Sequence, residues 1–279
     1  MMYSIVVRAV FFSKQCKQEL IMGAKPTKPA FFQMGSVIDV PLNATFVTSC
    51  NRAYVPGVLK LYASMQRVRT YYPLKCMCTT DVTDEQYKIL QRAGIATVRV
   101  PYVQNPYKSK WNEAFVKLLV WDWTQYDRVC WVDSDTLFLQ NCDELLTLPV
   151  EGAGIAAALD QEEWGDCHDV PAFDMLQTGV FVARPSKKTY RAMIDKLGKL
   201  PSCDGGDQGF LTSYFQQNNF RTTLFLSSKY NYMKRGLLRH KAYDLSRIKI
   251  LHFVGNPKPW NGGQKGYEKL QILWDKEGT

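Results

Sequence analysis

The sequence lacks the cysteine spacing that marks small zinc-stabilised domains. None of its eight cysteines forms a Cys-x-x-Cys pair, so no zinc ribbon is indicated. Several cysteines, such as Cys50 and Cys130, lie inside apolar runs, which is typical of buried free thiols. A chain of 279 residues can also bury a core large enough to fold without disulfides.

Long apolar runs, targeting signals and repeats are also missing. No stretch approaches the roughly 20 apolar residues that a membrane-spanning helix needs. Residues 1–15 contain neither a basic leader nor a small-residue cleavage site, so we expect no signal peptide. We therefore expect a soluble, intracellular and cytoplasmic protein with no membrane span.

Acidic residues are fewer than basic ones. The sequence has 26 Asp and Glu against 35 Lys and Arg, a net charge of +9. A basic excess favours anionic partners such as phosphate-bearing small molecules, although a solvated surface explains it equally well. The densest basic cluster, residues 229–241 (KYNYMKRGLLRHK), is accompanied by no recognisable nucleic-acid motif, so we do not expect nucleic acid as a partner.

Strand and helix patterns alternate from residue 44 onward. We expect strands at residues 44–50, 74–80, 95–103, 128–132, 154–159, 179–183 and 247–254. We expect helices from Pro56, from a capping box of Thr83 and Gln86 to Gly94, and at residues 112–126, 186–200, 207–218 and 269–276. This alternation predicts an α/β fold with a mostly parallel central sheet flanked by helices. Residues 1–43 are predicted to be an N-terminal extension to one domain at residues 44–279.

Two carboxylates stand where an apolar strand ends, in the segment WVDSDTLF at residues 131–138. Asp133 and Asp135 are two residues apart, so in an extended chain they point the same way and repel each other unless a cation lies between them. Mg²⁺ or Mn²⁺ suits an oxygen site that leaves room for phosphate. An ordinary surface turn explains the same short motif.

A second candidate segment is LHFVGNPKPW at residues 251–260. His252 is a candidate third metal ligand near the end of a predicted strand, in a mixed donor set that suits Mn²⁺. Gly255 permits close approach of the backbone to a phosphate, and Lys258 offers a charge for a diphosphate. The alternative is a core histidine beside a proline-rich loop.

The segment CDGGDQGF at residues 203–210 leads into a predicted helix. Asp207 and Gln208 would lie in its first turn, where they could hold sugar hydroxyls near the free backbone amides. Helix capping by Asp204 or Asp207 explains the same residues.

Two weaker candidate segments complete the set. In DMLQTGVFVAR, Gln177 and Thr178 precede a predicted buried strand, as residues of a plain turn also would. In FVTSCNRAY, Asn51 could contact a base edge and Tyr54 could stack on the base.

Taken together, these motifs resemble the family 8 glycosyltransferases, including glycogenin-like and galactinol synthase-like members. The resemblance covers roughly residues 44–262 and rests on FVTSCNRAY, KLLVWDWTQYDRVCWVDSDTLFLQN, QTGVFV, DGGDQG and HFVGNPKPW, in that order. It implies the GT-A (nucleotide-diphospho-sugar transferase) fold and a retaining, Mn²⁺-dependent transfer of a hexose from a UDP-sugar to a hydroxyl acceptor. That acceptor would be a carbohydrate, a polyol or a protein, and the chain would be a homodimer by analogy.

The resemblance also implies roles for the matching residues. The implied metal ligands are Asp133, Asp135 and His252, with Mn²⁺ preferred to Mg²⁺. Catalysis would involve Asp207, Gln208 and Lys117. The implied contacts to the donor and its metal are Thr48, Asn51, Tyr54, Lys117, Asp133, Ser134, Asp135, Asp169, Gln177, Thr178, Asp204, Asp207, Gln208, His252, Gly255 and Lys258.

The sequence departs from this family at two places. Gln177 stands where glycogenin-like members usually carry Asn, which would reshape the sugar pocket. Leu238 lies near the place of the self-glucosylated tyrosine of glycogenin, so we expect no self-priming.

Two other interpretations stay open. One is a non-catalytic UDP-sugar-binding protein with the same fold. The other is a phosphohydrolase of the haloacid dehalogenase type, suggested by VCWVDSDTLF. Leu137 and the mid-chain position of the motif disfavour that class.

Overall fold

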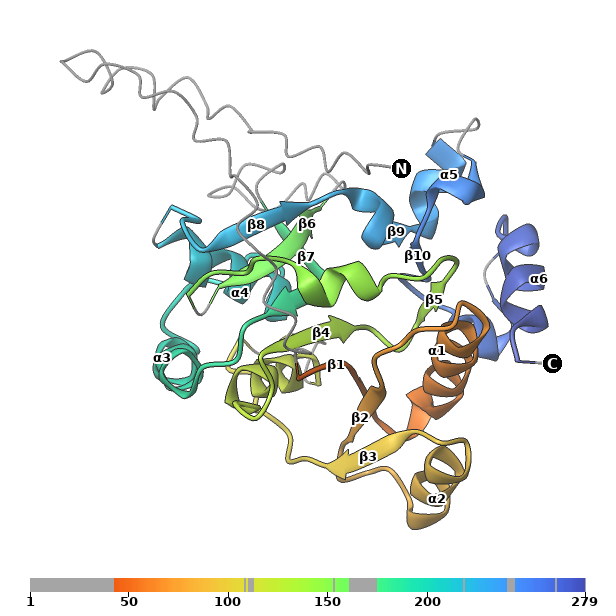
Figure 1. Cartoon of the computed structure of the whole chain (residues 1–279), viewed down its shortest axis with the longest axis horizontal. Helices are drawn as coiled ribbons and strands as arrows, with labels where there is room; N and C mark the ends of the chain where they lie inside the picture. The colour runs from red at the N-terminus through yellow and green to blue at the C-terminus, as the bar shows by residue number, and fades with distance from the viewer. Residues whose placement is uncertain are drawn as a thin grey trace. The chain divides into compact units, whose positions relative to one another are not determined.

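The structure, a computed structural model, describes residues 43–107, 109, 113–152, 154–160, 175–217, 219–239, 244–263 and 265–278. Its central sheet has seven strands in the order β3-β2-β1-β4-β7-β6-β8 (Figure 1). The strands are β1 (Ala44–Cys50), β2 (Leu74–Cys78), β3 (Ala96–Arg99), β4 (Arg128–Val132), β6 (Ile155–Leu159), β7 (Leu176–Ala183) and β8 (Thr223–Leu226).

Strand directions in this sheet are mostly parallel. Strands β3, β2, β1 and β4 pair in parallel, β7 is antiparallel to both β4 and β6, and β8 is parallel to β6. Among the described strands of this sheet, β7 alone therefore runs against the others. The predicted α/β fold with a mostly parallel sheet is confirmed.

A smaller sheet holds the second part of the candidate site. It has three strands in the order β5-β10-β9, which are β5 (Thr136–Phe138), β10 (Ile250–His252) and β9 (Tyr232–Met233). The strand predicted at 247–254 is thus shorter than expected and lies outside the central sheet. A 3-10 turn at Leu245–Arg247, capped by Asp244, precedes it, and the Phe253 amide extends the pairing by donating to the Asp135 carbonyl.

The central sheet is bordered by α1 (Val55–Arg67), α2 (Asp84–Arg92), α3 (Lys187–Lys196) and α4 (Asp207–Gln216) (Figure 1). The smaller sheet is bordered by α5 (Lys234–Arg239), which contacts β9, and by α6 (Glu268–Lys276), whose Leu270 and Trp274 pack with Leu137 and Leu251. Helix α1 packs on β1 and β5, α2 packs on β3, and α4 packs on β7. The predicted capping box is present, with the Thr83 side chain accepting from the Gln86 amide. Gly94 ends that segment at φ +90°, a conformation that favours glycine.

The helix expected at residues 112–126 is a 3-10 helix at Ala114–Asp122. Residues 110–112 lie outside the described part of the chain. Three aromatic and aliphatic side chains, Phe115, Leu118 and Trp121, are spaced by three and fully buried. Side chains spaced by three eclipse each other in a 3-10 helix, so this geometry buries all three on one face.

Strand β7 begins three residues earlier than predicted. Gln177 and Thr178 therefore lie inside the strand and not in a turn before it. The pairing of β7 with β6 shifts register between Ala157 and Ala158, which marks a β-bulge. A bulge re-aims side chains, and the polar residues of β7 lie beside it.

An aromatic stack fixes the 3-10 helix against the sheet. Trp121 stacks on Phe181 with ring centroids 5.4 Å apart, and Trp131 stacks on the same ring at 6.2 Å. All three rings are buried. The stack therefore holds the 3-10 helix, and Lys117 within it, against β4 and β7.

Two further expectations concern the whole chain. Among the described residues, no helix is both long and apolar enough to cross a membrane. The division into an extension at 1–43 and a domain at 44–279 stays a prediction, because the description begins at Asn43.

Candidate functional site

The two sheets bring two carboxylates and one imidazole together. Asp133 follows β4, Asp135 precedes β5, and His252 ends β10, where it pairs with Thr136. The His252 Nε2 atom lies 3.2 Å from Asp135 Oδ1 and 3.7 Å from Asp133 Oδ2. One ligand atom from each residue lies within 4.8 Å of the others. This mixed set of oxygen and nitrogen donors fits a divalent ion such as Mn²⁺.

The imidazole is oriented by Asn231, which was not among the predicted site residues, and through it by Gln177, which was. Asn231 Oδ1 lies 2.9 Å from His252 Nδ1, and Asn231 Nδ2 donates to Gln177 Oε1 at 2.6 Å. With Nδ1 held by Asn231, Nε2 is directed toward the two carboxylates. Gly179 leaves room for the ring, since a Cβ there would lie 2.4 Å from His252 Cε1.

Two buried lysines balance the carboxylates. Lys258 Nζ pairs with Asp135 Oδ2, and it lies 3.5 Å from the Phe253 carbonyl. Lys117 Nζ lies 3.1 Å from Asp133 Oδ1 and 3.0 Å from Asp207 Oδ2. Each carboxylate of the Asp-x-Asp motif therefore has its own lysine.

Burial and charge act against each other on these groups. Burial raises the pKa of Asp133, although Lys117 and His252 oppose it. Burial also acts to raise the pKa of Asp135, but His252 and Lys258 outweigh it and hold that pKa well below its usual range. Burial acts to lower the pKa of Lys117, yet Asp133 and Asp207 raise it. Asp135 is consequently the firmly ionised carboxylate of the pair.

A polar network connects helix α4 to strand β7. Thr178 Oγ1 donates to Asp207 Oδ2 at 2.6 Å, and the Thr178 amide lies 3.4 Å from Gln208 Oε1. Gln208 Nε2 donates to Asp160 Oδ2 at 2.6 Å. Asp160, which follows β6, was not among the predicted site residues. Asp207 and Gln208 are therefore fixed beside Lys117.

Asp204 has a structural role at the start of α4. Its Oδ1 atom accepts from the Gly206 and Gly209 amides, each at 2.9 Å. Of the two capping residues considered, Asp204 is thus the one that makes capping bonds, which leaves Asp207 free to face Lys117 and Thr178.

The segment after β1 forms another wall of the site. Asn51 Oδ1 accepts from the Ala53 and Tyr54 amides at 2.9 and 3.1 Å. The Tyr54 ring meets Trp260 edge-on at 5.2 Å, and Lys258 Nζ lies 5.6 Å from the Tyr54 ring centroid. An aromatic surface therefore adjoins the lysine that pairs with Asp135.

Two more predicted residues, Ser134 and Gly255, lie where another part of the chain comes close to the backbone. A Cβ on Gly57 would lie 2.6 Å from the Ser134 carbonyl, so glycine lets α1 approach the Asp-x-Asp segment. Gly255 has φ +82°, and a Cβ there would lie 3.2 Å from Arg235 Nη2.

One predicted residue is held inside the sheet. Thr48 is fully buried within β1, where it pairs with Cys76 of β2. Asp169, which was also predicted, lies outside the described residues, so its role stays a prediction.

The fold belongs to the GT-A class of glycosyltransferases. The crystal structure of glycosyltransferase GlyE from Streptococcus pneumoniae TIGR4 matches with a TM-score of 0.60 and 19% sequence identity, over 85% of this chain and 60% of that one. Residues 45–263 match the model of Glycosyl transferase family 8, and the chain belongs to this family.

Relatives in two branches of the family match the chain. It is 32% identical over 232 residues to glycogenin-1 of Oryctolagus cuniculus, covering 77% of this chain and 65% of that protein. It is 26% identical over 243 residues to galactinol synthase 2 of Solanum lycopersicum, covering 75% and 70%. The predicted family resemblance is confirmed. The chain spans less than two thirds of the length of the glycogenin-1 that it matches.

The phosphohydrolase interpretation is not supported. The family model covers the Asp-x-Asp segment and continues to residue 263, past His252 and Lys258. Both of these residues contact Asp135. The motif thus belongs to a glycosyltransferase domain.

Proposed function

We propose that this chain is a retaining, Mn²⁺-dependent hexosyltransferase that uses a UDP-sugar donor and a hydroxyl acceptor. The observation that carries the proposal is the cluster of Asp133, Asp135 and His252 with a buried lysine on either side. Membership of glycosyltransferase family 8 supports the reaction class.

Asp133, Asp135 and His252 would hold the ion. When bound, Mn²⁺ would neutralise charge that develops on the leaving diphosphate. Lys258 lies against Asp135 and beside Tyr54, so its ammonium group would add a second positive charge for the diphosphate. Tyr54 and Asn51 would contact the uracil ring.

Lys117, Asp207, Thr178 and Gln208 would hold the transferred sugar. The Asp207 carboxylate is fixed by Lys117 at 3.0 Å and by Thr178 at 2.6 Å. A fixed carboxylate serves either as a nucleophile or as a group that positions the sugar for attack on the same face, and both routes retain the anomeric configuration.

The proposal names several kinds of acceptor but a single kind of donor, a UDP-sugar. The matched relatives are a glycogenin and a galactinol synthase. We therefore propose a carbohydrate, polyol or protein hydroxyl as acceptor. A homodimer and a cytoplasmic location stay predictions.

Slow donor hydrolysis tests the proposal without a known acceptor. The full chain would be incubated with a panel of α-linked UDP-hexoses and Mn²⁺, and the released sugar followed by NMR. We expect one donor to be cleaved, with an α-configured hexose as the first product. Release of the β-anomer first would contradict retention.

A non-catalytic UDP-sugar-binding protein is the competing proposal. It predicts Mn²⁺-dependent binding of the same donors without release of UDP. Asp207→Asn separates the two, because the enzyme should lose turnover while keeping UDP binding. Equal, background-level UDP release by the wild type and this variant would favour the binding protein.

A further inference from the structure

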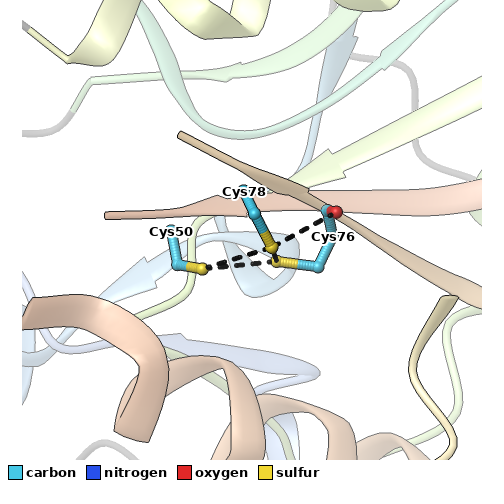
Figure 2. A group of neighbouring side chains, drawn as sticks. All are labelled: Cys50, Cys76 and Cys78. Atoms are coloured by element: carbon cyan, nitrogen blue, oxygen red, sulfur yellow. Dashed lines mark hydrogen bonds between the residues drawn. The ribbon is translucent and has the colours of Figure 1, made fainter. Parts of the chain in front are cut away.

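Three cysteines meet at a point in the domain that the proposed reaction does not use. Figure 2 shows the sulfur atoms of Cys50, Cys76 and Cys78 directed toward one another. The Sγ atoms of Cys50 and Cys76 are 3.6 Å apart, and each lies 3.9 Å from the Sγ atom of Cys78. All three are free thiols with at most 1% of their surface exposed.

The strand register creates this convergence. Cys50 ends β1 and pairs with Cys78 of β2, while Cys76 lies two residues earlier on β2. Residues two apart on a strand share a face, so the three side chains lie on one face of the sheet. Apolar residues of α1 and α2, among them Val58 and Leu90, pack over that face.

We propose that Cys50, Cys76 and Cys78 form a three-coordinate binding site for a soft metal ion, with Cu(I) as the occupant. A point in the plane of the three sulfurs lies about 2.2 Å from each, close to the bond length of about 2.3 Å between zinc and a cysteine sulfur. A metal ion would therefore fit between the three sulfur atoms without any movement of the strands.

The ligand set selects the kind of ion. Within the described residues, the group comprises these three cysteines and no histidine or carboxylate. Thiolate ligands select soft ions such as Cu(I), whereas structural zinc sites take four ligands. Binding forms three Cu–S bonds and releases the thiol protons to solvent, so affinity should rise with pH.

The neighbouring strands supply groups that suit a charged cluster. Thr48 and Thr97, which pair with Cys76 from either side, have buried hydroxyls with no hydrogen-bond partner among the described residues. A buried hydroxyl without a partner is costly, and a metal-bound thiolate would accept its hydrogen bond. Arg99 of β3 pairs with Cys78 of β2, and its guanidinium group forms an ion pair with Asp84 at 2.6 Å.

The site lies beneath the segment proposed to bind the nucleotide. Cys50 directly precedes Asn51, and the Cys50 carbonyl accepts from the Thr79 amide and hydroxyl, each at 3.0 Å. An ion on Cys50 would therefore constrain the start of the Asn51–Tyr54 segment. The metal proposal itself does not depend on the proposed transferase activity.

Competition for Cu(I) tests the site. The reduced full chain would be titrated with Cu(I) without oxygen, against a colorimetric Cu(I) chelator, and in a parallel arm with Zn²⁺. We expect about one tightly held Cu(I) per chain and a sulfur-to-copper absorption band. Cys76→Ala removes one of the three Cu–S bonds and should weaken Cu(I) binding by at least the roughly 10- to 100-fold that loss of a supporting contact costs. Cys50→Ala, at the end of its strand, gives the same test if the first variant does not fold.

Cys130→Ala is the matched control, because Cys130 is an equally buried free thiol in β4. It should bind Cu(I) like the wild type. Equal Cu(I) affinity of the wild type and the Cys76 and Cys50 variants would overturn the proposal. So would loss of copper in Asp135→Ala alone, which would place the ion at the acidic cluster, or Zn²⁺ binding as tight as Cu(I).

Discussion

At the scale of single residues, the proposed metal site depends on one glycine, Gly179. His252 lies against Gly179, where any Cβ would come within 2.4 Å of the ring. The ring is also tied through Asn231 to Gln177. The position of Nε2 is thus set by packing on one side and hydrogen bonds on the other.

Gly179→Ala should displace His252 while leaving the other two ligands in place. We expect Mn²⁺ affinity to fall by about 10- to 100-fold, the usual cost of disturbing a ligand's supporting contacts. Calorimetric titration of the full chain with Mn²⁺ measures this change.

Val180→Ala is the control for that variant. Val180 is the next residue of β7 and is buried in the cluster on the other face of the strand. It should lower the free energy of unfolding and leave Mn²⁺ affinity unchanged. Unaltered Mn²⁺ binding by Gly179→Ala would show that the contact with His252 does not position the ligand.

Sequence reasoning named the charged residues that the structure brings together, but it missed two of the residues that support them. Asp133, Asp135 and His252 are of residue types that commonly bind metal ions, and each lies near the end of a predicted strand, so the sequence alone indicated them. Asn231 and Asp160 are polar residues whose partners lie 21 and 48 positions away in sequence. Only the folded strands bring those pairs together, which explains why neither was predicted.

At the scale of secondary structure elements, local sequence patterns predicted whether a segment is a helix or a strand better than they predicted its length. The segment at Ala114–Asp122 is helical as expected, but it is a 3-10 helix and it ends at Asp122, before the predicted end at residue 126. Strand β3 stops at Arg99, just before Val100 and Pro101. The strand predicted at residues 95–103 was therefore too long, because proline lacks an amide proton and Pro101 cannot continue the ladder.

Thr83→Ala tests the start of helix α2. The capping box satisfies two backbone amides through Thr83 and Gln86. Removing the threonine hydroxyl should lower the free energy of unfolding by about 1 kcal/mol. Urea denaturation measures the difference.

Thr80→Ala, three residues earlier, removes the same atoms from an exposed turn. It should change the free energy of unfolding by less than about 0.5 kcal/mol. Equal stability of the two variants would contradict a stabilising cap at Thr83.

At the scale of the whole molecule, the site exists because two sheets meet. The central sheet supplies Asp133 and the polar residues of β7, while β10 of the smaller sheet supplies His252. The alternation of strands and helices predicted the first sheet. It could not predict the second, because β5, β9 and β10 have only two or three residues each.

Removal of residues 1–42 should leave the domain intact. Asn43 anchors the first strand through its amide to Asp127 Oδ2 at 3.0 Å, and the sheets and the metal cluster lie beyond it. We expect the shortened chain to unfold cooperatively and to bind Mn²⁺ like the full chain. Loss of folding in the shortened chain, seen by circular dichroism, would contradict the predicted domain boundary.

Calorimetric titration with UDP tests the central claim most directly. Asp135 is held ionised by His252 and Lys258, so it should be the strongest ligand of the ion that binds UDP. We predict tight UDP binding by the full chain with Mn²⁺, much weaker binding without it, and no Mn²⁺ dependence in Asp135→Ala. Absence of UDP binding under both conditions would contradict the account, as would an unchanged Mn²⁺ dependence in the variant.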